Sequence, residues 1–341
     1  MITTDFAKHL SAFLSQYLPG ERAASHNTIL SYRDTFILFI GYMKTQKGIA
    51  AEKLHLANIT RSVVVEFLNW LQDNRKSSNA TRNYRMAAIH SFFSYLQYEM
   101  PEKINQWQEI LSIKVKRVDK KSICYMTLDS IRLLFEQVDT TNRQGRRDLA
   151  LLALLYDTGA RVQEIIDLSP SDVRLENPAI IKLLGKGRKE RIVPLQKEQT
   201  IILSEYILEN RLDRMENNRC PLFFNKRGEK LTRSGITYIL NHYIENARKH
   251  HPQLIPDHVS PHTLRHSKAM HLLQAGVNLI YIRDLLGHVT IQTTEIYARA
   301  DSKQKREALE KAYADVIPEK NIRGSWENDE TLLYWLKNLD K

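Results

Sequence analysis

The sequence predicts a mainly α-helical protein with one small β-sheet, in which a helical N-terminal domain precedes an α+β domain. Apolar residues recur at three- and four-residue intervals through the first hundred residues, which is typical of one-sided helices, and helical patterns return from about residue 232. Two β-branched or leucine-rich runs, 179–184 and 191–195, flank a polar segment with two glycines and indicate a β-hairpin. A chain of 341 residues is long enough for two domains with well-formed cores.

The N-terminal domain, residues 1–110, is expected to form a compact helical bundle. Periodic apolar positions predict helices over residues 28–40, 63–71 and 81–98. In the last of these, one stripe is interpreted as core: Met86, Ile89, Phe92, Phe93 and Leu96. Arg82, Arg85 and His90 are expected to lie off that stripe, and basic residues are expected on one side of the bundle.

The charge balance favours a polyanionic partner. Lysine and arginine number 50 against 39 acidic residues, a net charge of +11, and each basic side chain that neutralises a phosphate releases counterions. A basic surface without a specialised role is the alternative. No apolar stretch approaches the roughly 18 residues of a membrane span, and no secretory signal is visible. Cys124 and Cys220 form no metal-ligand pair, and we expect a cytoplasmic protein.

Residues 111–124 are predicted to be a basic linker between the domains. No helical stripe continues there, and five of the eleven residues 111–121 are basic: Lys114, Lys116, Arg117, Lys120 and Lys121. An extended segment of this composition suits a path along a phosphate backbone, and a solvated linker that touches nothing is the alternative. Together with Arg33, Arg82 and Arg85, these basic residues are the predicted DNA contacts.

The second domain, residues 125–310, opens with a helix over 128–138 that Thr127 caps. A nearly continuous apolar run within 147–156 predicts a helix buried on most sides, which ends at Gly159. Arg161 follows that turn, where an unpaired guanidinium would be costly, and Glu164 is placed to hold it. A purely structural ion pair is the alternative.

Lys186 lies between two glycines at the tip of the predicted hairpin. Such a lysine can reach into a DNA groove, although an exposed basic turn explains the segment equally well. The spacing of the glycines is not that of a phosphate-binding P-loop. Lys189, three residues further on, is a weaker candidate for the same role.

Ser260 and Pro261 predict the start of a helix on which His262 and Arg265 share a face. A helix N-terminus also favours an anion such as a phosphate. His262 and His266 have the spacing of a zinc pair. However, Arg265 would repel a cation and no cysteine or glutamate ligand is near, so no metal site is expected.

The last of these segments joins His288, in a turn that Gly287 closes, to Tyr297 on the next helix. Most tyrosines only pack, and Tyr297 is one of 15. Combined with the other segments, it completes a set suited to phosphoryl transfer without a metal or nucleotide cofactor. Two arginines can clamp phosphate oxygens, a lysine and histidines can move protons, and the phenol can attack phosphorus.

This order of residues resembles the tyrosine recombinases, especially phage-type integrases and Xer-type recombinases. The matching segments are 158–164, 185–195, 260–266 and 286–297, and residues 27–33 and 81–96 resemble that family's core-binding domain. The similarity covers about residues 5–310.

The resemblance implies roles for six residues. Arg161 and Arg265 would bind the scissile phosphate, and Lys186 would be the general acid for the leaving 5′-hydroxyl. His262 and His288 would assist proton transfer, and Tyr297 would form the 3′-phosphotyrosine.

The resemblance also implies a two-domain clamp on double-stranded DNA, a homotetramer on two recombination sites, and a Holliday-junction intermediate. An integrase or transposase of a mobile element is the preferred role, with Xer-type dimer resolution as the alternative. An accessory DNA-bending or directionality protein is a further partner that such systems use. A type IB topoisomerase, a telomere resolvase and a non-catalytic DNA-binding regulator are less favoured alternatives.

The C-terminal tail, residues 311–341, is longer than a minimal Xer-type protein requires. An apolar face is formed there by Trp326, Leu332, Leu333, Trp335, Leu336 and Leu339. From Gly324 onward four acids stand against two lysines, which argues against DNA contact. We expect the tail to dock on a neighbouring protomer, and a helix folded back on its own domain is the alternative.

Overall fold

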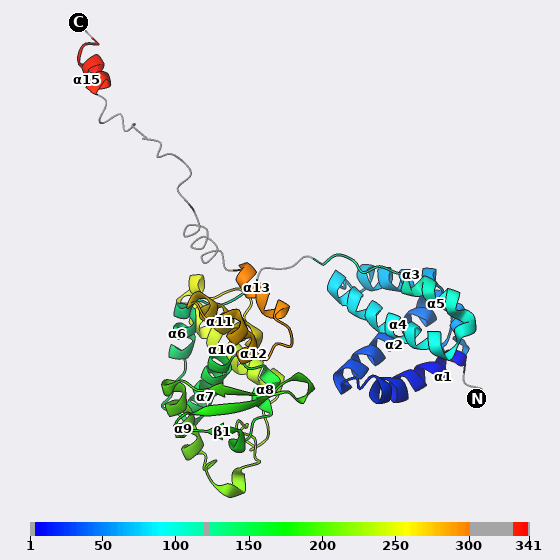
Figure 1. The fold of residues 1–341 in the computed structure, drawn as a ribbon, viewed down its shortest axis with the longest axis horizontal. Coiled ribbons are helices and arrows are strands. Elements are labelled where there is room, and N and C mark those ends of the chain that lie inside the picture. The colour runs from blue at the N-terminus through cyan, green and yellow to red at the C-terminus, as the bar shows by residue number, and fades with distance from the viewer. Residues whose placement is uncertain (1–3, 119–122, 301–329, 340–341) are drawn as a thin grey trace. The chain divides into compact units, whose positions relative to one another are not determined.

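The computed structural model describes residues 4–118, 123–300 and 330–339 of the chain. The chain divides into two compact units, residues 1–121 and 122–341, and the division falls within the predicted linker (Figure 1). Both units are mainly helical, and the second also contains a small sheet, as the sequence predicts. No helix in the described part of the chain is long and apolar enough to span a membrane.

The first unit is a bundle of helices that begin at hydroxyl caps. Ser25, Thr60 and Ser78 each accept a backbone N–H bond at the start of a helix, which satisfies a donor that the helix itself leaves free. The three predicted helices are confirmed, and each is longer than predicted, most of all the first, which continues to Lys47. The helices are α1 (Asp5–Ala12), the π-helical segment Phe13–Glu21, α2 (His26–Lys47), α3 (Arg61–Asp73), α4 (Asn79–Glu99) and α5 (Ile104–Leu111).

Aromatic rings fill the core of this bundle. The ring centroids of Phe13 and Phe36 lie 5.3 and 5.2 Å from that of Phe92, and Phe93 packs against Trp107. These rings are buried. The interpretation of Phe92 and Phe93 as core residues is therefore confirmed.

Arg82 does not lie off the apolar stripe, and that expectation was wrong. The residue is only 4% exposed, because it precedes Met86 by one helical turn and falls on the buried face of α4. Burial lowers the pKa of its guanidinium, and its Nε and Nη1 atoms have no hydrogen-bond partner among the described residues.

Residues 116 and 117 are attached to α4. The Asn83 side chain exchanges two hydrogen bonds with the backbone of Lys116, at 2.8 and 3.0 Å, and Asn79 donates to the Arg117 carbonyl. The described part of the linker therefore does not correspond to a free solvated chain.

The second unit surrounds a buried helix with further helices and a three-stranded antiparallel sheet (Figure 1). Its first helices are α6 (Leu128–Glu136), α7 (Arg143–Thr158) and α8 (Val162–Ile166). The strands β1 (Val173–Arg174), β2 (Ile180–Leu184) and β3 (Glu190–Pro194) follow, and β2 and β3 form the predicted hairpin with Leu184 opposite Glu190. The later helices are α9 (Lys197–Glu209), α10 (Arg233–His250), α11 (Pro261–Gln274), α12 (Leu279–Leu286), α13 (Gln292–Ala300) and α15 (Glu330–Lys337).

Local signals set the ends of these helices as predicted. Residues 150–155 of α7 are buried, and Gly159 ends the helix in the left-handed conformation at φ 57°. Pro261 occupies the first turn of α11, and Gly287 ends α12 at φ 63°. The turn between α12 and α13 therefore places His288 and Tyr297 on adjoining segments.

Candidate active site

Arg161 is held by Glu164 one turn later. Its backbone N–H donates to Glu164 Oε2 at 2.8 Å and its Nη1 donates to Oε1 at 2.7 Å. Gly159 allows this turn, because a Cβ there would lie 2.7 Å from Leu286 Cδ2. The predicted pairing of Arg161 with Glu164 is confirmed.

Arg191, which was not selected from the sequence, also binds the Glu164 carboxylate. Its Nη1 and Nη2 donate to the two oxygens of Glu164 at 3.0 and 2.6 Å. Burial alone would raise the pKa of Glu164, but the hydrogen bonds and charge of Arg191, with those of Arg161, hold that pKa below its ordinary value. Arg191 lies on the same face of β3 as buried Val193. A basic residue at an inward-facing position of the predicted strand could have indicated its role from the sequence.

The C-terminal end of α12 gathers three guanidinium groups. The carbonyl of Leu285 accepts from Arg191 Nε at 2.8 Å, that of Leu286 from Arg265 Nη2 at 2.6 Å, and that of Gly287 from Arg161 Nη2 at 3.4 Å. Because these carbonyls are consecutive, the three arginines lie beside one another.

Arg265 is the most enclosed of these three. It is 4% exposed, and its other bond goes to the Gly159 carbonyl at 2.6 Å. Burial, reinforced by the charge of Arg161, lowers the pKa of its guanidinium to about 10, so it stays charged at neutral pH.

Tyr297 lies in contact with two histidines. Its Oη is 3.0 Å from His266 Nδ1, and its ring is parallel to that of His288 at 6.5 Å between centroids. The residue is 1% exposed, and burial raises the pKa of its phenol while the charges of Arg265 and Arg161 lower it in part. His266 was considered in the sequence only as a metal ligand, although it stands one residue after Arg265 on the same helix.

His288 and His262 border the same arginines. Burial first, then the charges of Arg265, Arg161 and Arg191, lowers the pKa of His288 to about 4, and its Nδ1 lies 2.9 Å from Thr294 Oγ1. His262 opens to solvent, and partial burial with the charges of Arg265 and Arg161 lowers its pKa too. Both rings are therefore neutral near pH 7.

A cleft of about 520 Å³ opens beside these residues, and Arg161, Arg191 and His288 line it together with Lys189 and Arg283. Lys186 begins the short turn Lys186–Arg188 at the hairpin tip, next to this cleft's Gly185, but its side chain lies outside the described residues. In the described ranges no three histidine, cysteine, aspartate or glutamate side chains are grouped as metal ligands would be.

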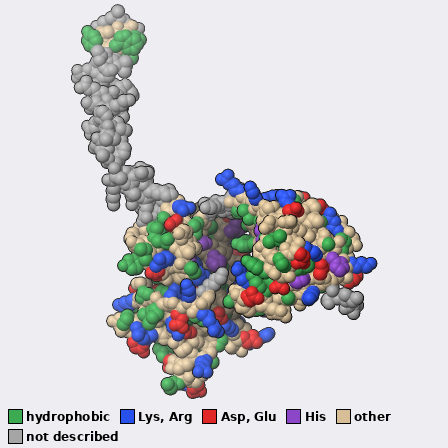
Figure 2. All heavy atoms as spheres, turned by 45° about the vertical axis from the view of Figure 1, so that its right-hand side comes forward, with side chains coloured by type: hydrophobic (Ala, Val, Ile, Leu, Met, Phe, Trp, Pro, Cys, Tyr) green, Lys and Arg blue, Asp and Glu red, His purple; other side chains and the backbone are tan. Residues whose placement is uncertain are grey.

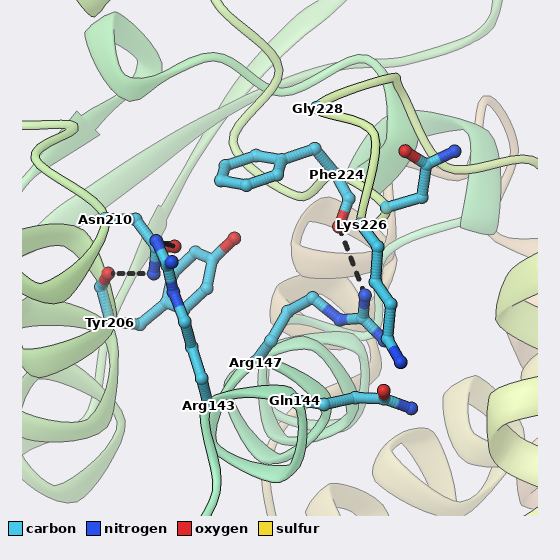
Figure 3. A pocket seen from close by; sticks show the side chains of 9 residues that line it. Arg143, Gln144, Arg147, Tyr206, Asn210, Phe224, Lys226 and Gly228 are labelled. Carbon is cyan, nitrogen blue, oxygen red and sulfur yellow. Dashed lines mark hydrogen bonds between the residues drawn. The ribbon is translucent and has the colours of Figure 1, made fainter.

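Another cavity, of about 280 Å³, lies at the far end of α7. Arg143, Arg147, Tyr206 and Phe224 line it, and Arg147 donates to the Phe224 carbonyl at 3.2 Å (Figure 3). The 16 residues of α7 separate its N-terminal end from Arg161 by about 24 Å, so this cavity is not part of the arginine cluster.

The predicted DNA contacts of the first unit have varied surroundings. Arg33 is exposed and paired with Asp34 at 2.8 Å, whereas Arg85 donates to the Ser31 carbonyl and to Thr35 Oγ1, both at 3.1 Å. Lys114, Lys116 and Arg117 are exposed, and Lys120 and Lys121 lie outside the described residues.

Comparison with known proteins identifies the family. The model of the Phage integrase family matches residues 125–304, and that of the Phage integrase N-terminal SAM-like domain matches residues 10–100. The chain belongs to the tyrosine recombinases of the phage integrase family. It is a DNA strand-transferring enzyme of that type.

Relatives of this tyrosine recombinase cover nearly its whole length. A candidate integrase/recombinase of Sinorhizobium fredii, y4rC, is 35% identical over 97% of each chain. The tyrosine recombinase XerD of Listeria monocytogenes is 34% identical over 82% of this chain and 90% of its own. The structure of the XerH recombinase bound to difH, a pre-cleavage complex, superposes with a TM-score of 0.64 and 25% identity over 86% of this chain and 82% of that one.

Arg191→Gln should lower the free energy of unfolding of the second unit by about 3 kcal/mol, because it leaves a buried carboxylate with half of its cationic partners. Denaturant unfolding measures the change. The matched control is Arg146→Gln, whose pair with Glu209 is partly exposed and should matter much less. Equal losses of unfolding free energy in the two variants would contradict the view that Arg191 stabilises the buried Glu164 carboxylate.

Proposed function

We propose that Tyr297 cleaves one DNA strand at a phosphate held by Arg161 and Arg265. The phenol oxygen bonds to phosphorus and forms a 3′-phosphotyrosine, the bond from phosphorus to the 5′-oxygen breaks, and Lys186 supplies the proton for the 5′-hydroxyl. A 5′-hydroxyl from a second strand then attacks the phosphotyrosine, and two such rounds pass through a Holliday junction. His262 and His288 position the phosphate and assist proton transfer.

The observation that carries this proposal is the imbalance of charge around residues 285–287. Three guanidinium groups converge there, and Glu164 is the one carboxylate that the described residues pair with them. Clustered cations in a protein interior need anionic partners. A DNA phosphate supplies that charge, and the arginines can stabilise the further charge that develops during attack.

Tyr297 must become accessible before it can react. A hydroxyl in a residue that is 1% exposed cannot touch a phosphate, so we infer that DNA binding moves α13 or its neighbours. The enzyme thus keeps its nucleophile covered until a site is bound.

As a biological role we propose integration or excision of a mobile element, which the name of the Sinorhizobium relative supports. Resolution of chromosome dimers is the second candidate, because relatives of similar identity are named XerC and XerD. In either case the working form is a homotetramer on two double-stranded DNA sites in the cytoplasm. The six catalytic positions serve both roles equally.

For the tail we propose docking on a neighbouring protomer. The described part of α15 and the two residues after it include exposed Tyr334, Trp335, Leu336 and Leu339. Figure 2 shows hydrophobic side chains at this end of the chain. Exposed apolar groups of this size favour burial against another surface. Such a contact would couple the active sites of the tetramer.

The wild-type protein should form a covalent adduct with a nicked suicide recombination site, and Tyr297→Phe should form none. Denaturing gels of labelled DNA measure the adduct. Tyr156→Phe is the matched control, since its hydroxyl also lies 2.9 Å from a histidine, His271, yet has no part in the proposed chemistry. Persistent adduct in Tyr297→Phe would refute the assignment of the nucleophile.

Deletion of residues 324–341 should abolish or slow recombination between paired sites while thermal unfolding and suicide-site cleavage stay near wild type. Lys337→Ala, which removes a charged side chain of the same helix and leaves its apolar residues in place, should leave recombination intact. Wild-type recombination by the truncated protein would exclude the docking proposal.

A further inference from the structure

We propose that His266 is the base that takes the proton from Tyr297. This inference rests on the proposed function and adds a seventh residue to the six positions above. The geometry points to it directly, because His266 Nδ1 lies 3.0 Å from the oxygen that attacks phosphorus. That distance is within the range needed for proton transfer in one step.

The contact has no competing hydrogen-bond partner among the described residues and is shielded from water. His266 is the hydrogen-bond partner of the Tyr297 hydroxyl in the part of the chain that the structure describes. Since Tyr297 is almost fully buried, bulk water does not reach the hydroxyl to compete for its proton. The pair is therefore already formed in the free protein, and the proposal requires that it persists when DNA binding uncovers the hydroxyl.

His266 also has the protonation state that the role requires. Burial, then the charges of His262 and Arg265 on its own helix, lowers its pKa below the ordinary 6.5. Tyr297 and neutral His288 face it from α13 and from the turn before α13. The imidazole is thus neutral at pH 7, and the proposal assigns it the tautomer with hydrogen on Nε2, in which Nδ1 accepts from the Tyr297 hydroxyl.

The other two histidines are less suitable. His288 Nδ1 is engaged with Thr294, and its ring lies parallel to that of Tyr297 rather than directing a nitrogen at the hydroxyl. His262 lies one turn before His266, with 6.5 Å between ring centroids, and its ring opens to solvent. Neither is placed to receive the phenolic proton in this arrangement.

The step balances without any co-reactant. The proton of Tyr297 moves to His266 Nδ1 as the phenol oxygen bonds to phosphorus. The bond to the 5′-oxygen breaks, and that oxygen takes its proton from Lys186. In the rejoining step a 5′-hydroxyl gives its proton back to the Lys186 amine and its oxygen bonds to phosphorus. The bond from phosphorus to the tyrosine oxygen breaks, and that oxygen recovers its proton from the His266 imidazolium.

His266→Asn separates basicity from hydrogen bonding. An asparagine oxygen can replace Nδ1 as an acceptor, but it cannot take up a proton at neutral pH. We expect single-turnover cleavage of a suicide site to slow by about 10²- to 10⁴-fold at pH 7 in both His266→Asn and His266→Ala. An acceptor that merely orients Tyr297 would be rescued by asparagine.

The pH profile provides a second readout. In the wild type, cleavage should decline as pH falls through the lowered pKa of His266, where the imidazole becomes protonated. In His266→Asn the phenol must lose its proton to solvent, so its rate should rise about tenfold per pH unit between pH 7 and 9. Replacing Tyr297 with a fluorinated tyrosine, whose phenol is more acidic, should reduce the difference in cleavage rate between His266→Asn and the protein that retains His266.

Two controls complete the experiment. His271→Asn alters the similar His–Tyr pair on the same helix, with 2.9 Å to the Tyr156 hydroxyl, and should cleave at the wild-type rate. A 5′-bridging phosphorothiolate site, whose sulfur leaves without a proton, should not rescue His266→Asn, whereas it should rescue a Lys186 variant.

Wild-type cleavage by His266→Asn, or a deficit that is constant with pH, would overturn the role of His266 while leaving that of Tyr297 intact. Absence of a covalent adduct even in the wild type would instead refute the proposed function itself. Equal thermal unfolding and DNA binding of the variants separates either outcome from misfolding.

Discussion

The C-terminal end of α12 is the point on which the rest of the site depends. The last carbonyls of a helix have no partner within it, and the helix dipole makes that end negative. Here three consecutive carbonyls accept from Arg191, Arg265 and Arg161. Gly287 is needed at the same place, because its φ is 63° and a Cβ would lie 2.9 Å from Arg191 Nη1. Segments far apart in the chain thereby meet at one turn.

The positive charge at this turn is only partly neutralised by the acidic residues that the structure describes around it. Glu164 serves both Arg161 and Arg191, and Arg265 is held by backbone carbonyls without a carboxylate. Positive charge that a protein's own acids do not neutralise costs stability in the free enzyme and is recovered when an anion binds. Burial, together with the charge of these cations, lowers the pKa of the neighbouring histidines, so that the site combines fixed positive charge with uncharged imidazoles.

Burial of the proposed nucleophile complements that arrangement. Tyr297 belongs to a small apolar cluster with Ala269, Met270, Leu273, Ile282 and Leu286, from α11 and α12. Burial raises the pKa of the phenol, which keeps the hydroxyl protonated, and the proposed mechanism assigns its activation to the nearby arginines and to His266, 3.0 Å away. The resting and reactive states then use the same residues, and they differ in whether the Tyr297 hydroxyl can reach a phosphate.

Local features were readable from the sequence, because caps, periodicity and turn glycines act over a few residues. Thr127, Gly159, Pro261 and the 185–189 hairpin tip all hold the positions predicted for them. The Arg161–Glu164 pair was readable for the same reason, since one helical turn joins its members. Only the tertiary structure showed that Arg82 is buried, that Arg191 binds Glu164 and Leu285, and that His266 meets Tyr297. Those contacts join residues 27 to 94 positions apart or depend on the phase of a helix against its neighbours, and no local pattern encodes either.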